Sequence, residues 1–226
     1  MKSNRIFALC FRAAAFVLCL AGVLDVTGVF AGNFAPIALA YYTTESNIFV
    51  LAVFGILLVR TAAQIKRDGA NGRVSGLERL SAIAALAITV TLIIFWGLLA
   101  PGSNWRFLIS YTNLQLHTLA PILMLADFFL FGEPGKLKRR DPWIFAALPI
   151  GYFIQATVLG FSGLITYGAA VGSTEIKPSR FPYFFIDFDL IGAFVFVYVA
   201  AISVFFMALA YLFLWIDRRR ASAKRH

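Results

Sequence analysis

Twenty uncharged residues run from position 80 to position 99 as LSAIAALAITVTLIIFWGLL. A helix of that length is about 30 Å long, which matches the hydrocarbon core of a bilayer. Five further stretches, also mostly apolar, occupy residues 6–31, 37–59, 107–131, 143–169 and 190–215. Together they predict an all-α integral membrane bundle of six transmembrane helices. Little chain is left for a separate domain, so residues 1–226 are interpreted as one six-span domain.

The composition excludes a soluble globular domain. Hydrophobic residues make up 61% of the chain and charged residues 14%, whereas globular domains usually have about 45–50% and about 25%. The two cysteines, Cys10 and Cys19, lie nine residues apart on one predicted helix, so they are not expected to form a disulfide with each other. No metal-binding or nucleotide-binding motif is present, and the sequence predicts neither a metal ion nor a cofactor.

The basic residues predict the orientation of the bundle. Apart from Arg106, Lys177 and Arg180, the 20 lysines and arginines lie around the start of the first span, between spans two and three, between spans four and five, or after span six. By the positive-inside rule, both termini are predicted to be cytoplasmic. The net charge of +9 is spread over four segments without interleaved aromatic residues, so no nucleic-acid partner is expected. Membrane lipids are the expected partners, and no pattern predicts a protein partner.

His117 lies inside the fourth predicted span, and the chain has one other histidine, at position 226. An ionisable side chain at membrane depth costs a few kcal/mol or more, so it usually faces the bundle interior or a wet cavity and marks a functional site. Asn113 lies one helical turn before His117 on the same face. We therefore interpret His117 as a candidate functional residue, with Asn113 placed to orient its ring.

The second predicted span opens with the polar cluster YYTTESN at positions 41–47. On a helix, Thr43, Ser46 and Asn47 share one face, and the helical rise places Thr43 at a depth compatible with contact to His117. A threonine hydroxyl needs a neighbouring base to act as a nucleophile, and a neutral imidazole suits that task. The pattern predicts Thr43 as nucleophile and His117 as base, with Asn47 donating a hydrogen bond to a developing oxyanion.

Each of these polar patterns also has a purely structural interpretation. The same polar residues can be interhelical hydrogen bonds, worth about 0.6 kcal/mol each, and spacing alone favours neither reading. Asp127 is expected near the cytoplasmic end, where Lys136 or Arg139 neutralises it. The last outer loop, SRFPYFFIDFD at positions 179–189, either caps the mouth of a pocket or forms an aromatic belt at the membrane interface. Its composition favours the belt.

Three patches together resemble a known family: YTTESN at 42–47, HTLAP at 117–121 followed by DFFLF at 127–131, and FPYFFID at 181–187. They are similar to the prokaryotic six-span "Pr-six-Pr" membrane proteins, a group similar to the eukaryotic androgen-induced gene one and androgen-dependent TFPI-regulating proteins. Those eukaryotic proteins are membrane hydrolases of fatty acid esters of hydroxy fatty acids that use a threonine and a histidine. In this chain Pro121 follows His117 by four residues, against five in the eukaryotic motif.

The resemblance implies specific roles. It assigns the nucleophile to Thr43, with Thr44 as the competing candidate, and the base to His117. Ser46 and Asp187 fall within the matching patches and are candidate supporting or substrate-binding residues. A lipid-like ester is the implied substrate, and the prokaryotic relatives imply a bacterial inner membrane.

The leading hypothesis is thus a six-helix membrane hydrolase of lipid-like esters near the outer leaflet. One alternative is a non-catalytic membrane protein that binds or transports a small ligand through the polar core around His117. A purely structural polar network is the other. A hydrogen bond between Thr43 and His117 on the wall of a cavity would favour the hydrolase over the purely structural network.

Overall fold

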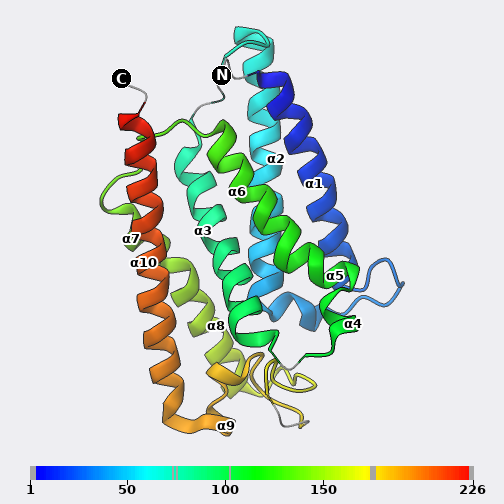
Figure 1. Ribbon diagram of the computed structural model, residues 1–226. Coiled ribbons are helices and arrows are strands. Elements are labelled where there is room, and N and C mark those ends of the chain that lie inside the picture. Colours follow the sequence, from blue (N-terminus) through cyan, green and yellow to red (C-terminus); the bar gives the residue numbers. More distant parts are fainter. Residues whose placement is uncertain (1–3, 73, 75, 102, 174–176, 224–226) are drawn as a thin grey trace.

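A computed structural model describes residues 4–72, 74, 76–101, 103–173 and 177–223. Six helices in this part of the chain are long and apolar enough to cross a membrane, and no strand is formed there. The prediction of an all-α, six-span bundle is confirmed. The protein is a multi-pass helical membrane protein, in which the first turn of the first helix and the last turn of the last helix lie at the same end (Figure 1).

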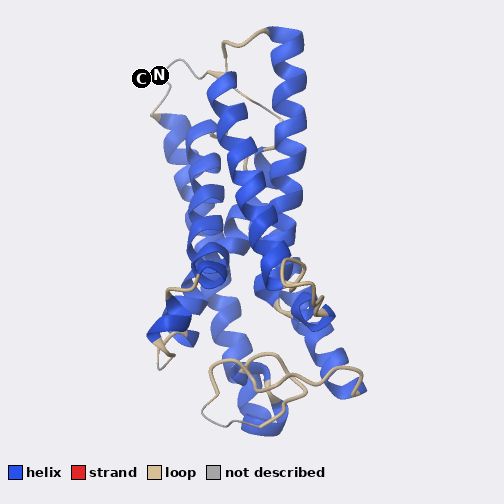
Figure 2. Cartoon of the chain, turned by 90° about the vertical axis from the view of Figure 1, so that its right-hand side faces the viewer, coloured by secondary structure: helices blue, strands red, loops and turns tan. Residues whose placement is uncertain are grey.

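In the described part of the chain, the spans are built from nine α-helices and several short helical turns. They comprise α1 (Arg5–Val26); α2 (Tyr42–Asp68); α3 (Glu78–Ile94) with the π-helical turn η2 (Phe95–Leu99); α5 (Tyr111–Leu114) with the π-helical turn η3 (Gln115–Leu119) and α6 (Ala120–Phe131); α7 (Asp141–Phe145) with α8 (Ala147–Ser162); and α9 (Phe188–Ile191) with η5 (Gly192–Phe194) and α10 (Val195–Ser222). The connections contain η1 (Pro36–Ala40), α4 (Trp105–Leu108) and η4 (Phe184–Ile186). Loops gather toward the ends of the bundle (Figure 2).

α3 is the central helix of the bundle. It contacts α2, α6 and α10, and its alanines at 82, 84, 85 and 87 are buried. Small side chains let neighbouring helices approach closely, which is how helices associate in a bilayer. α10, by contrast, exposes Phe196, Val197 and Val204 on its outer face, as expected of a helix in contact with lipid.

Two predicted spans end earlier or begin later than the apolar pattern indicates. The fourth was predicted from residue 107, but the spanning helix begins at Tyr111, because the extended backbone of Ser110 ends one helical turn and its hydroxyl caps the next at the N–H of Asn113. The fifth was predicted to reach residue 169 and ends at Ser162. There Gly163 adopts a left-handed conformation with φ 69°, which terminates a helix and favours glycine. Hydropathy reports burial in lipid but not these local caps.

The second and sixth spans also differ from their predicted limits. α2 starts at Tyr42 instead of residue 37, because Pro36 opens the separate turn η1, and it continues to Asp68 as an amphipathic extension. The sixth span runs from Phe188 to Ser222, interrupted at Gly192, where φ is 55°.

A buried ion pair fastens three helices together. Arg12 of α1 donates to both carboxylate oxygens of Asp127 of α6, at 2.6 and 3.0 Å, and to the hydroxyl of Thr61 of α2 at 2.6 Å. Arg12 is 2% exposed and Asp127 1% exposed. The prediction that Lys136 or Arg139 neutralises Asp127 is therefore wrong. Arg12, counted among the charges that set the orientation, is in fact a core residue.

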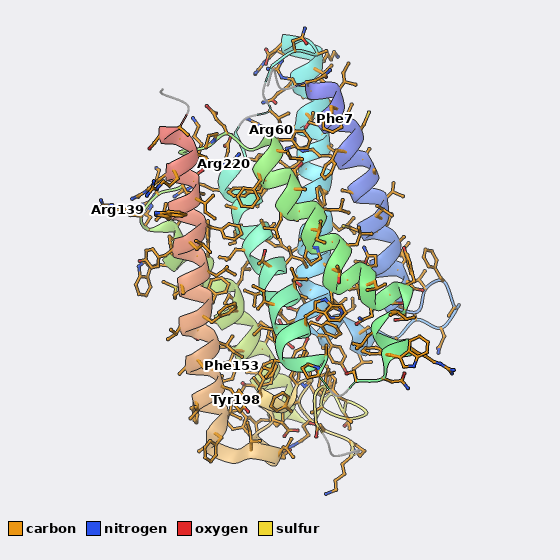
Figure 3. All side chains as sticks on the ribbon, in the orientation of Figure 1. Phe7, Arg60, Arg139, Phe153, Tyr198 and Arg220 are labelled. Atoms are coloured by element: carbon orange, nitrogen blue, oxygen red, sulfur yellow. The ribbon has the colours of Figure 1, made fainter. Side chains whose placement is uncertain are left out.

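Most of the described basic residues lie at the end of the bundle that holds the first turn of α1; Arg106, Lys177 and Arg180 do not. Arg60, Arg139 and Arg220 mark this end, whereas Phe153 and Tyr198 lie toward the other (Figure 3). Four of the basic residues used to predict the orientation lie outside the described residues: Lys2, Arg73, Lys224 and Arg225.

Candidate active site

The first turn of α2 places Thr43 against the fourth span. Tyr41 caps the helix with an extended backbone, and its carbonyl accepts the N–H of Glu45 at 3.0 Å. Thr43, the second helical residue, points its hydroxyl at the imidazole of His117, with 3.2 Å between Oγ1 and Nε2. The structure thus brings together the two residues that the sequence pattern paired.

The second ring nitrogen of His117 determines which way this hydrogen bond runs. Nδ1 lies 3.2 Å from the backbone oxygen of Asn113. A carbonyl can only accept, so Nδ1 carries the proton and Nε2 presents a lone pair to the Thr43 hydroxyl. The imidazole is therefore in the tautomer that a base for Thr43 requires. Asn113 orients the ring through its backbone and not through its side chain, which donates to the carbonyl of Leu108 at 3.0 Å.

His117 belongs to the π-helical turn η3, which faces the second π-helical turn, η2. The imidazole stacks on Phe95 of η2, with ring centroids 3.7 Å apart and an interplanar angle of 23°. Beside this contact, the indole N–H of Trp96 donates to the hydroxyl of Thr118 at 3.0 Å. Single π-helical turns within α-helices are frequent at functional sites. Here the two turns hold the imidazole plane against Phe95 and its edge toward Thr43.

Asn47 ties α2 to the turn that carries His117. Its amide nitrogen donates to the carbonyls of Thr43, at 2.8 Å, and of Leu116, at 3.2 Å. In a π-helical turn the Leu116 carbonyl would accept from residue 121, which is Pro121 and has no N–H. The Asn47 amide supplies that missing donor. Because both of its N–H bonds are used and the residue is 0% exposed, the prediction that Asn47 donates to an oxyanion is wrong.

The other predicted supporting residues lie around the pair without joining it. The Ser46 hydroxyl bonds the Thr43 carbonyl at 3.0 Å and the Thr91 hydroxyl at 2.9 Å, linking α2 to α3. Thr44 is 2% exposed and does not line the cavity described below. Of the two threonines, Thr43 alone contacts both that cavity and His117.

Asp187 holds the outer loop in shape. Its carboxylate accepts from the Ser179 hydroxyl at 2.6 Å and from the backbone N–H groups of Asp189 and Leu190 at 2.9 and 3.1 Å, at the start of α9. It does not line the cavity beside Thr43. The structure therefore gives Asp187 an anchoring position at the loop, away from the Thr43–His117 pair.

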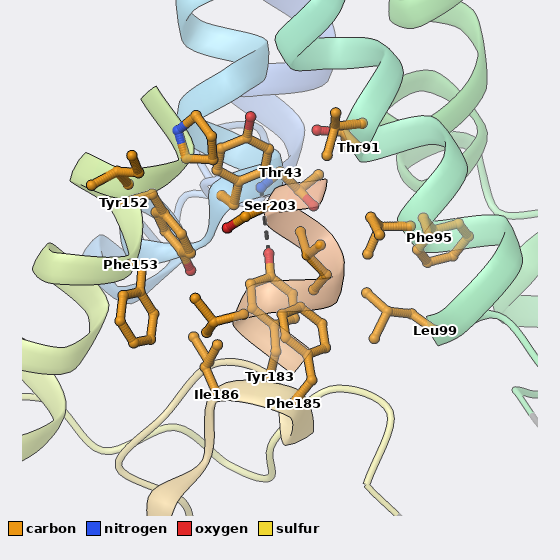
Figure 4. Close-up of a pocket in the computed structure, with 17 residues that line it drawn as sticks. Thr43, Thr91, Phe95, Leu99, Tyr152, Phe153, Tyr183, Phe185, Ile186 and Ser203 are labelled. Atoms are coloured by element: carbon orange, nitrogen blue, oxygen red, sulfur yellow. Dashed lines mark hydrogen bonds between the residues drawn. The ribbon is translucent and has the colours of Figure 1, made fainter. Parts of the chain in front are cut away.

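A cavity of about 280 Å³ lies beside Thr43 (Figure 4), close to the lower limit of about 300 Å³ for small-molecule sites. Its wall comes from α2, α3, η2, α8, the outer loop and α10, and none of its described lining residues is charged. They are Tyr42, Thr43, Val90, Thr91, Ile94, Phe95, Leu99, Pro149, Ile150, Tyr152, Phe153, Tyr183, Phe185, Ile186, Val199, Ile202 and Ser203. His117 contacts two residues of this wall, Thr43 and Phe95.

The outer loop closes one end of the cavity. Tyr183, Phe185 and Ile186 point into it from the loop (Figure 4). Because Phe181, Tyr183 and Phe185 are buried, the structure favours the interpretation of residues 179–189 as a cap over the pocket and not as an aromatic belt. Sequence reasoning also missed Phe95 and Tyr183 as neighbours of the pair. Residue type alone does not distinguish an aromatic side chain that contacts a site from one that lies at the membrane interface.

Comparisons of the chain with known protein families, with curated proteins and with solved structures find no match. Within the described ranges, no group of three or more histidine, cysteine, aspartate or glutamate side chains is arranged to hold a metal ion. The site places the hydroxyl of Thr43 beside the imidazole of His117 at the wall of a cavity.

Replacing Asn47 with leucine is expected to lower the free energy of unfolding by about 1–3 kcal/mol, since the buried Leu116 carbonyl loses its donor and the Thr43 carbonyl keeps only the Ser46 hydroxyl as a side-chain donor. Denaturant unfolding in detergent measures the change. Thr89→Val is the matched control, because the Thr89 hydroxyl donates to Ala85 within its own helix and joins no second element. If Asn47→Leu were no more destabilising than Thr89→Val, the tie between α2 and η3 would carry no stability.

Proposed function

We propose that the protein is a membrane hydrolase of neutral, lipid-like esters, with Thr43 as the nucleophile and His117 as the general base. The observation that carries the proposal is the 3.2 Å contact between Thr43 Oγ1 and His117 Nε2 at the wall of an uncharged cavity. The carbonyl of Asn113 supports the tautomer that this role needs.

The proposed reaction has two halves. Thr43 Oγ1 bonds to the ester carbonyl carbon while its proton passes to His117 Nε2, and the carbonyl electron pair moves onto oxygen. The tetrahedral intermediate collapses, the carbon–alkoxy bond breaks, and His117 gives its proton to the leaving alcohol. Water then gives a proton to His117 and attacks the acyl group on Thr43. The carbon–Thr43 bond breaks, the acid leaves, and the proton returns to Thr43.

The cavity supports the choice of substrate. Its wall is mainly aliphatic and aromatic, and its polar groups are hydroxyls, those of Thr43, Thr91 and Ser203 and of three tyrosines. A charged head group would lose its hydration there without a compensating partner, whereas an acyl chain joined by an ester would not. The resemblance to the "Pr-six-Pr" proteins and their eukaryotic hydrolase relatives favours the same substrate class, and we propose that relationship for this chain.

The distribution of charge supports an orientation. Most of the described basic residues lie at the end of the bundle that holds the first turn of α1, as Arg60, Arg139 and Arg220 illustrate (Figure 3). By the positive-inside rule this end, with both termini, is cytoplasmic. Thr43 then lies toward the outer leaflet of the membrane, which we propose to be a bacterial inner membrane.

Labelling with a fluorophosphonate tests the nucleophile. The purified protein in detergent is expected to hydrolyse a neutral long-chain ester and to carry one phosphonyl adduct, located on Thr43 by mass spectrometry. The Thr44→Ala variant should retain the adduct, and Thr43→Ala should lose it together with turnover.

Other results would contradict the assignment in distinguishable ways. An adduct on Thr44, lost in Thr44→Ala, would move the nucleophile by one residue. Absence of both adduct and turnover in the wild type, with saturable binding of the ester, would favour a protein that binds or transports a small ligand.

A further inference from the structure

The cavity contains three tyrosine hydroxyls, and two of them are occupied. The hydroxyl of Tyr42 donates to the carbonyl of Ala87 at 3.4 Å, and that of Tyr152 donates to the carbonyl of Ala40 at 3.3 Å. Each of these protons is held by backbone on the cavity wall.

The hydroxyl of Tyr183 is arranged differently. It accepts a hydrogen bond from the backbone N–H of Thr43 at 3.4 Å (Figure 4), and the hydroxyls of Thr43 and Tyr152 lie beside it. That N–H lies in the first turn of α2 and has no acceptor within the helix. Unlike Tyr42 and Tyr152, Tyr183 donates its proton to no described backbone group, and it lies directly beside the nucleophile. The 3.4 Å bond from the Thr43 N–H is long, so this N–H can exchange Tyr183 for a better acceptor.

The position of Tyr183 is fixed by its surroundings. The residue is 5% exposed, and its ring stacks on Phe185 with centroids 5.2 Å apart and an interplanar angle of 5°. The backbone on either side pairs with Val171, through Val171 N–H to Pro182 O at 2.9 Å and Phe184 N–H to Val171 O at 3.1 Å. A donor held in this way needs no reorganisation when charge develops near it.

Burial keeps the phenol protonated. It raises the pKa of Tyr183 to about 12, and the neighbouring hydroxyls of Thr43 and Tyr152 offset only part of that effect. At neutral pH the group is a hydrogen-bond donor and not an anion.

We propose that the hydroxyl of Tyr183 and the backbone N–H of Thr43 form the oxyanion hole of this site, an inference that rests on the proposed ester hydrolysis. When Thr43 Oγ1 bonds to the carbonyl carbon, the electron pair of the C=O bond moves onto oxygen. Tyr183 donates its O–H to that oxygen, and the Thr43 N–H turns from Tyr183 to the same atom. Both bonds are released when the intermediate collapses and the carbonyl re-forms.

Two other polar groups near the pair are already committed. The Asn47 amide is used on two carbonyls. The Thr91 hydroxyl contacts Ser46 at 2.9 Å and the carbonyl of Ala87 at 3.5 Å. The outer loop thus contributes a catalytic residue to the site as well as a cap.

Replacing Tyr183 with phenylalanine tests the proposal. For the full-length protein hydrolysing a neutral long-chain ester, kcat is expected to fall roughly 100-fold, as for loss of one oxyanion donor elsewhere, while KM stays near the wild-type value. Tyr167→Phe is the matched control. Tyr167 is equally buried in the same aromatic cluster, but its hydroxyl has no partner among the described residues and does not line the cavity.

A second measurement separates donation from packing. Fluorinated tyrosine at position 183 keeps the shape of the ring and lowers the phenol pKa, so kcat should vary with the degree of fluorination while the unfolding temperature does not. The same substitution at position 167 should leave kcat unchanged. A kcat independent of fluorination at position 183 would overturn the proposal.

The outcomes also distinguish this inference from the function on which it rests. If Thr43→Ala and His117→Ala abolish turnover while Tyr183→Phe keeps the wild-type kcat, the oxyanion assignment is wrong and the hydrolase stands. If Thr43→Ala keeps turnover, the proposed hydrolase itself is wrong, and the role of Tyr183 falls with it.

Discussion

Replacing His117 with alanine is expected to lower kcat for ester hydrolysis by at least roughly 10⁴-fold, the scale on which nucleophile–base pairs lose activity when one member is removed. Without the imidazole, no described side chain within hydrogen-bond distance of Thr43 Oγ1 can take its proton. The measurement is turnover of a long-chain ester by the purified protein at saturating substrate. Because chemistry and not binding is impaired, KM should change little.

Added imidazole sharpens this test. The alanine variant leaves a space beside Phe95, against which the native ring stacks, so free imidazole in the buffer should restore part of kcat. Thr118→Val is the control in the same helical turn, since it removes only the bond from Trp96, and it should keep kcat. A His117→Ala protein with undiminished turnover would show that the histidine is not the base.

Replacing Asp127 with alanine is expected to destabilise the bundle by about 3–5 kcal/mol, because it leaves the guanidinium of Arg12 buried without its counter-charge. Arg12 would retain only the hydroxyl of Thr61. Denaturant unfolding in detergent measures the loss, which should appear in stability more than in substrate binding, since neither residue lines the cavity.

Two further variants test whether the loss of stability comes from the unpaired charge of Arg12. The double change Arg12→Met with Asp127→Leu removes both charges and fills similar space, so it should recover most of the stability. Asp68→Ala breaks the exposed pair with Arg67 and the longer, 3.8 Å contact with Arg5, and should have only a small effect. If Asp127→Ala behaved like Asp68→Ala, the three-helix junction would not depend on this ion pair.

The sequence predicts the six spans well because each needs only a long apolar stretch, but their ends depend on single residues. Ser110 and Gly163 end helical segments inside apolar sequence, and an average over twenty residues does not register them. Arg12 shows the same limit. A charge near the start of a span fits both an orientation signal and a buried pair, and only the packing of α1 against α6 decides between them.

The pairing of Thr43 with His117 could be proposed from sequence because helical rise places both at a similar depth. The roles of Asn47, Asn113 and Tyr183 could not be predicted from the sequence. Periodicity assigns a residue to a helix face but does not say which neighbour that face contacts. The sequence therefore predicts a hydrogen bond from Asn47 to an oxyanion, whereas its amide donates to the Leu116 carbonyl. Tyr183 comes from a loop, whose path no periodicity describes.

The two facing π-helical turns also limit how the sequence of this protein can evolve. A π-helical turn is equivalent to an α-helix with one residue inserted, and each residue of an α-helix advances the side-chain direction by about 100°. Loss of a single residue within Gln115–Leu119 would therefore close this segment into an ordinary α-helical turn and change the direction of the side chains inside it, His117 among them. The length of this segment can therefore tolerate less variation than most of the side chains that it carries.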